Sequence, residues 1–162
     1  MVLTILQGLK KVKHLDRKVK KFQERIAKWG SYFDPFESPP QYEVKPLVQA
    51  VSDMLAERAR IRHALHATNA LHQIEYKGKK ITIDDLLIMV TVTIPTKIAT
   101  LKLLKRKEKP YHMEKEKEQK VILQYDPADR DRQIDALENE VDEINGVLDE
   151  INITVDVFKY IQ

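Results

Sequence analysis

Apolar residues recur at spacings of three and four over residues 127–152, near the C-terminal end of the chain. This spacing is the a/d stripe of a heptad helix, so it predicts a helix with one apolar seam and polar flanks. Asp126 followed by Pro127 marks its start, because Asp caps helices and Pro fits the first helical position. The predicted seam contains Ile134, Leu137, Val141, Ile144, Leu148 and Ile151. Such a helix must bury its seam against a partner, since it is not stable alone.

Residues 1–29 repeat the pattern and offer that partner. Lysines and arginines occupy the other faces of this predicted first helix, whereas the flanks of the last helix are almost all acidic. We therefore expect the first and last helices to pair, either within one subunit or between subunits. The seam of the first helix includes Val12, Val19, Phe22 and Ile26, together with Ile5, Gly8, Leu15 and Trp29.

Two further helices and a hairpin are predicted between these ends. A second helix begins at Pro46 or Leu47 and runs to about residue 69. Apolar residues alternate on both sides of Lys77-Gly78, which predicts a β-hairpin over residues 72–83. A third helix follows to about residue 105 with a kink near Pro95, although the alternation over residues 90–94 also fits a strand. Residues 121–125 can form a short third strand beside the hairpin.

The order of elements predicts a mainly α fold in one domain, residues 1–162. We expect a bundle of four long helices with heptad-patterned N- and C-terminal helices, plus a small β-hairpin of two or three short strands. Hydrophobic residues make up 43% and charged residues 33%, which fits a folded helical chain. The longest uncharged apolar run, residues 86–96, is half of the roughly 20 residues that a membrane span needs. Without such a span or a signal peptide, we expect a cytoplasmic protein.

Charge is distributed unevenly although the net charge is only +3. Residues 1–30 contain nine Lys/Arg against two Asp/Glu, and residues 126–162 contain three against eleven. Packing of the basic helix on the acidic one is the favoured interpretation, because the two are of matched size. The alternative is that the basic helix binds nucleic acid or an anionic membrane surface. No recognised nucleic-acid motif is present, so nucleic acid is the less favoured partner.

Aromatic residues concentrate in a proline-rich stretch after the first helix: Trp29, Tyr32, Phe33, Phe36 and Tyr42. Packing against the bundle ends is the simplest interpretation of this loop. A stacking surface for a planar ligand is the alternative. At a subunit interface, these rings could combine with cationic side chains to hold a small anionic or nucleotide-like ligand. The cations considered are Arg58, Arg62, Lys77, Lys79 and Lys80.

No pattern in the chain specifies a reaction. The chain has no Cys, and the lysines around Gly78 do not form a GxxxxGK[ST] phosphate loop. His63 and His66 are one turn apart with His72 beyond them, but no carboxylate or third histidine is fixed in reach. We therefore expect no metal, no cofactor and no enzyme activity. The leading hypothesis is a non-catalytic, homo-oligomerising helical module with a structural or interaction role, and ligand sequestration or anionic-surface binding are the alternatives.

Four features in series resemble a septicolysin-like family of small bacterial helical proteins. They are the Leu-rich N-terminal helix, residues 66–87 (HATNALHQIEYKGKKITIDDLL), residues 120–135 (KVILQYDPADRDRQID) and residues 149–157 (DEINITVDV). The resemblance covers most of the chain and implies a helical bundle decorated by a hairpin. It carries over no catalytic residues. The chain departs from the family pattern in the aromatic stretch over residues 30–46 and at Pro95.

Overall fold

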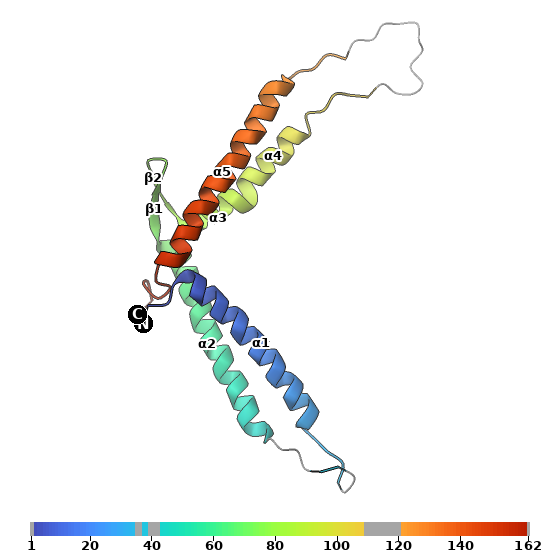
Figure 1. Cartoon of the computed structure of the whole chain (residues 1–162), viewed down its shortest axis with the longest axis vertical. Coiled ribbons are helices and arrows are strands. Elements are labelled where there is room, and N and C mark those ends of the chain that lie inside the picture. The colour runs from blue at the N-terminus through green and yellow to red at the C-terminus, as the bar shows by residue number, and fades with distance from the viewer. Residues whose placement is uncertain (1, 35–36, 39–42, 109–120, 162) are drawn as a thin grey trace. The chain divides into compact units, whose positions relative to one another are not determined.

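The structure, a computed structural model, describes residues 2–34, 37–38, 43–108 and 121–161. Its elements follow the order α1 (Ile5–Trp29), α2 (Val44–Leu71), β1 (Gln73–Tyr76), β2 (Lys79–Thr82), α3 (Ile83–Ile88), the π-helix η1 (Met89–Thr93), α4 (Ile94–Lys102) and α5 (Pro127–Thr154) (Figure 1). The mainly helical fold with a small β-hairpin is therefore confirmed. The chain divides into two compact units, Met1–Ile83 with Asp149–Gln162, and Asp84–Leu148. One bundle of all four long helices, with heptad geometry, stays a prediction.

In the first unit, α1 lies along α2 (Figure 1). The seam of α1 is buried at Ile5, Val12, Leu15 and Val19, and α2 contributes buried Ile61, Ala64 and Leu65. A Cβ added at Gly8 would lie 3.6 Å from Ile61 Cγ2 and from Leu65 Cδ2, so the helices approach closely there.

In this unit α1 thus packs against α2. The charge pattern of the sequence had instead favoured the last helix as its partner. A connection of about 14 residues makes neighbours of consecutive helices, and α2 offers an apolar stripe of its own. Two ion pairs join them, Lys11 Nζ to Glu57 Oε1 and Arg58 Nε to Asp16 Oδ1, both at 2.5 Å. Pairing of α1 with α5 of another copy stays a prediction.

The ends of α1 and α2 follow from their capping chemistry. Thr4 caps α1 with a capping box, in which Gln7 N donates to Thr4 Oγ1 (3.3 Å) and Thr4 N donates to Gln7 Oε1 (3.0 Å). Helix α1 therefore starts four residues later than predicted. Helix α2 starts earlier than predicted, because Pro46 lies in its first turn, where backbone N–H groups have no intrahelical acceptor.

The β-hairpin is confirmed with Ile74 opposite Ile81 and Tyr76 opposite Lys79. Lys77 and Gly78 both have positive φ, 49° and 75°, as a two-residue type I′ turn requires. The predicted third strand is wrong, since residues 121–125 form no strand. They lead directly into α5, and the Ile122 side chain is 85% exposed.

Residues 83–102 are helical throughout, so the strand alternative for residues 90–94 is excluded. Pro95 has no N–H, and in a regular α-helix its ring would collide with the carbonyl of Thr91. The wider turn of η1 relieves this collision, and Ile94 N donates instead to Met89 O, five residues back. The predicted kink is therefore a π-helical segment, and α4 ends at Lys102 rather than at residue 105.

Helix α5 begins as its sequence predicts, with Ala128 N donating to Asp126 Oδ1 at 2.9 Å. Beyond its end, residues 155–161 return to the start of α1, and we call them the C-terminal clasp. Ile5 N donates to Val155 O (3.1 Å), and Val157 N donates to Leu3 O (2.8 Å). The clasp thus closes the first unit around the beginning of α1. Among the described residues, no helix combines the length and apolarity that crossing a membrane requires.

Candidate functional site

The strongest candidate surface lies on the paired helices α4 and α5 of the second unit (Figure 1). Lys102 Nζ lies 3.7 Å from Glu138 Oε1, which links the two helices. Arg130 in the first turn of α5 donates to the carbonyl of Leu104, just beyond α4, at 2.6 Å. These contacts link α4 and α5, which run antiparallel (Figure 1).

The facing apolar side chains of this pair form what we call the α4–α5 seam: Ile98, Leu101, Ile134, Leu137 and Val141. Each of them is only half-buried, whereas Ile144 and Leu148 further along α5 are buried. Two helices have too little surface to enclose such a seam, because a helix buries fully only the face covered by its neighbours. The seam therefore leaves apolar surface uncovered in this unit.

Open hollows flank the seam on both sides. One has a volume of about 560 Å³, and Leu101, Ala136 and Leu137 form its apolar wall with Lys97 and Gln133 at its edge. The other, of about 640 Å³, has Ile98, Ala99 and Val141 as its apolar wall beside Lys102 and Asp142. The surface of both hollows is mainly apolar, although Thr96 and Thr100 also line the first, and such a surface suits another helix better than a polar substrate.

Further apolar surface lies on the elements that precede α4. Ile88 is 54% exposed and Val92 is 58% exposed. They are about one turn apart, so they share a face of this helical segment. Exposed β-branched side chains in adjacent turns extend the uncovered apolar surface of the second unit beyond the seam.

The aromatic residues predicted as a stacking surface lie at the far end of α1 from the clasp. Tyr32 is 46% and Phe33 75% exposed. Trp29 is half-buried, and Lys28 Nζ lies 5.8 Å from its ring centroid. Phe36 and Tyr42 lie outside the described residues, so their part in this prediction is untested.

The predicted cationic partners lie elsewhere in the first unit. Arg58 pairs with Asp16, and Arg62 is exposed on α2. Lys77, Lys79 and Lys80 are exposed at the hairpin, which follows α2, whereas the aromatic stretch precedes it. Because the 28 residues of α2 span about 40 Å, one chain does not bring the rings and the hairpin lysines together. A ligand site that combines them at a subunit interface stays a prediction.

The histidines do not converge as metal ligands. His63 and His66 are exposed on α2, and the described part of the chain holds no group of three or more His, Cys, Asp or Glu that could bind a metal ion. His72 instead meets the clasp, with its Nδ1 2.9 Å from the Tyr160 hydroxyl. Partial burial lowers the pKa of His72 below 6.5, and the positive charge of Lys159 lowers it further. The sequence carries no signal for this pair, because the two residues are 88 positions apart.

Comparison of the chain with protein-family models, with curated proteins and with solved structures finds no match. The resemblance to septicolysin-like proteins therefore stays a prediction.

Proposed function

We propose that the protein is a non-catalytic structural or interaction module that forms a homo-oligomer through the α4–α5 seam. Two copies of the α4–α5 pair would make a four-helix, coiled-coil-like bundle around one shared seam. The observation that carries this proposal is the half-burial of all five seam residues between two open, apolar hollows.

The area still exposed on the seam is enough to matter for association. Full burial of an aliphatic side chain contributes about 1.5–3 kcal/mol, and at most about a third of each of the five seam side chains is still exposed. Completing their burial therefore gives roughly 1–5 kcal/mol per copy, or about 2–10 kcal/mol for two copies. Association costs on the order of 4–15 kcal/mol in lost rotational and translational freedom.

Charge favours one arrangement of the two copies. Helix α4 contains Lys97 and Lys102 and no acidic residue, whereas α5 contains nine Asp/Glu against two arginines. Two α5 helices side by side would repel each other. Contact of α4 from one copy with α5 of the other is therefore preferred.

Sedimentation velocity of the full chain over about 1–100 µM tests this proposal. We expect the native protein to sediment as an oligomer and the double variant Leu137→Gln/Val141→Gln as a helical monomer, because two polar side chains in the seam oppose its burial. The matched control, Val48→Gln/Leu71→Gln, changes two exposed apolar residues of α2 in the first unit and should leave the oligomer intact. A folded native monomer over the whole range would contradict the proposal.

A further inference from the structure

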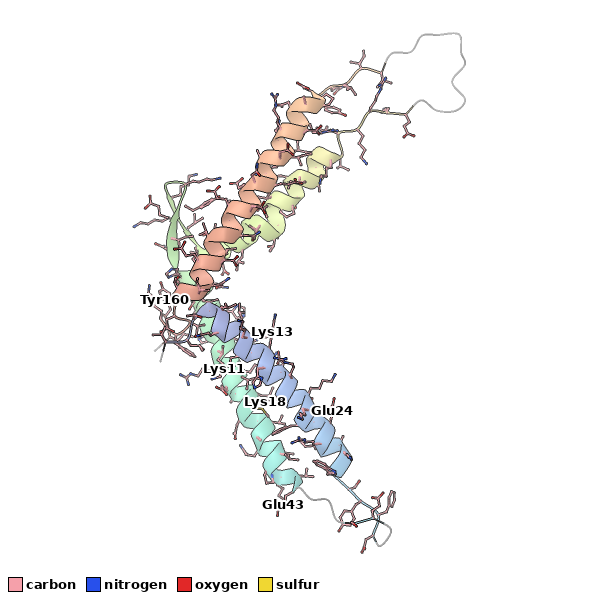
Figure 2. All side chains as sticks on the ribbon, in the orientation of Figure 1. Lys11, Lys13, Lys18, Glu24, Glu43 and Tyr160 are labelled. Atoms are coloured by element: carbon pink, nitrogen blue, oxygen red, sulfur yellow. The ribbon has the colours of Figure 1, made fainter. Side chains whose placement is uncertain are left out.

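The outer face of α1 carries a line of cations. Lys10, Arg17, Lys21 and Lys28, which we call the α1 cationic row, fall within about 40° of one another around the helix, opposite its buried seam. All four are exposed. The row is about 27 Å long at 1.5 Å per residue. Lys13, Lys18 and Lys20 flank it, and Figure 2 shows Lys13 and Lys18 along the same helix.

The row is only partly neutralised within the first unit, where Glu24 lies on the same face of α1, one turn from Lys21 and from Lys28. Among the described residues, the α1 side chains in salt bridges are Lys11 and Asp16, and no residue of the row takes part in one. Helices α1 and α2 together contain thirteen Lys/Arg against four Asp/Glu. A surface with this excess of positive charge attracts anions.

The row ends beside aromatic rings, of which Tyr32 and Phe33 are exposed and Trp29 is half-buried. Lys28 lies over the ring of Trp29, and Tyr32 and Phe33 follow within five residues. We call Trp29, Tyr32 and Phe33 the aromatic end. A cationic track that leads to exposed flat rings is the combination by which proteins bind single-stranded nucleic acid, with phosphates on the cations and bases stacked on the rings.

Two other partners fit this face less well. A helix that binds a membrane surface needs a free apolar face, but the seam of α1 is buried in the first unit. Within the described part of α1, Leu9 is the one large aliphatic side chain that is exposed, at 44%. A protein partner gains little, since lysine is depleted from protein interfaces and exposed ion pairs contribute about 0–1 kcal/mol. Phosphate backbones release condensed counterions when lysines bind them, so they gain most from such a row.

We propose that the α1 cationic row and the aromatic end bind single-stranded nucleic acid without sequence readout. Each phosphate contact contributes a salt slope of about −0.7 for single strands, so four contacts predict a slope near −3. This binding is independent of the proposed assembly, because it uses the first unit rather than the α4–α5 seam.

Titration of the full chain with a thymidine oligonucleotide of about 20 nucleotides tests the proposal. Trp29 is the single tryptophan, so its fluorescence reports directly on the aromatic end. We expect quenching on binding at low salt and an affinity that falls with salt at the slope above. Replacing the four residues of the row by Gln should weaken binding at least about tenfold and remove most of the salt dependence.

Two further variants separate the parts of the site. Tyr32→Leu/Phe33→Leu should weaken binding at least about tenfold with the salt slope unchanged, because bases stacked on the rings contribute to affinity without counterion release. The matched charge control replaces Lys105, Arg106, Lys107 and Arg132 by Gln, which removes the same charge from the second unit away from the α4–α5 seam. This control should bind like the native protein. Circular dichroism checks that each variant is folded.

Several results would overturn the proposal. One is that the native protein does not bind the oligonucleotide at about 50 mM salt. Another is that the row variant and its charge control lose the same affinity relative to the native protein. Tighter binding of anionic lipid vesicles than of the oligonucleotide would assign the row to a membrane surface. Loss of assembly in the row variant, with unchanged oligonucleotide binding, would assign it to a protein interface.

Discussion

Side chains at the C-terminal end of α2 contact the C-terminal clasp, and His72, directly after the helix, shows how such a contact changes a side chain's chemistry. The Tyr160 ring packs edge-on against His72 at 6.0 Å between centroids, and their polar atoms are 2.9 Å apart. Partial burial and the charge of Lys159 both disfavour the protonated imidazole. The folded state therefore favours neutral His72.

This preference predicts a pH dependence of stability with a definite sign. The pKa of His72 is lower in the folded state than its unfolded value of 6.5, so the unfolded chain binds more protons below that pH. The contribution of His72 to stability is full above pH 6.5 and is lost as the pH falls through the folded pKa. Urea unfolding at pH 7.5 and 5.5 should show a larger loss for the native protein than for His72→Gln. An equal loss in both would contradict the prediction.

At the scale of elements, sequence patterns located helices and the hairpin well because their determinants are local. Asp126 and Pro127 fixed the start of α5, and Lys77-Gly78 fixed the turn between β1 and β2. The π-helix η1 was missed, because the β-branched alternation before Pro95 fits a strand as well as a helix. Only the surrounding helical contacts, which a local pattern does not contain, decide between the two.

Glycines in two elements make a matched test of local backbone conformation. Gly78 has φ of +75°, where a Cβ is strained, so Gly78→Ala should lower the free energy of unfolding by about 1 kcal/mol. Gly146 lies within α5, with nothing within 4 Å of an added Cβ. Gly146→Ala should therefore raise it by about 0.8–1 kcal/mol through helix propensity. Chemical denaturation measures both, and changes of the same sign would contradict this account.

At the scale of the whole molecule, sequence patterns predicted less. The same three-four spacing suits any helical partner, so the seam of α1 could not show that α2 would cover it. Because α1 is basic and α5 is acidic, the sequence favoured pairing of these two helices. In the first unit, however, α1 packs against α2. The rings and hairpin lysines were grouped by chemistry, although α2 separates them along its length. The clasp contacts join residues about 90 to 150 positions apart, which no local pattern encodes.

Thr68 provides the test of that long-range closure. Its side chain is 0% exposed, and its Oγ1 donates to Val157 O at 2.9 Å. Thr68→Val keeps the shape but leaves this carbonyl without a donor where water has little access, so stability should fall by about 1–3 kcal/mol. Thr68→Ser keeps the hydroxyl and serves as the control, with a smaller loss expected. Denaturation of both variants by urea measures the difference, and a Val variant as stable as the native protein would refute the role of this bond.

The clasp also has a consequence for the order in which a growing chain becomes structured. Residues 1–83 leave the ribosome first, but the segment that closes over Leu3 and Ile5 comes after the entire second unit. At about 5–20 residues per second, the roughly 70 intervening residues delay closure by about 4–14 s. During that interval the nascent α1 and α2 expose the apolar surface around Gly8 to the cell. Chaperones that recognise exposed apolar surface therefore have a defined window to act on this chain, and it closes only after Val157 has left the ribosome.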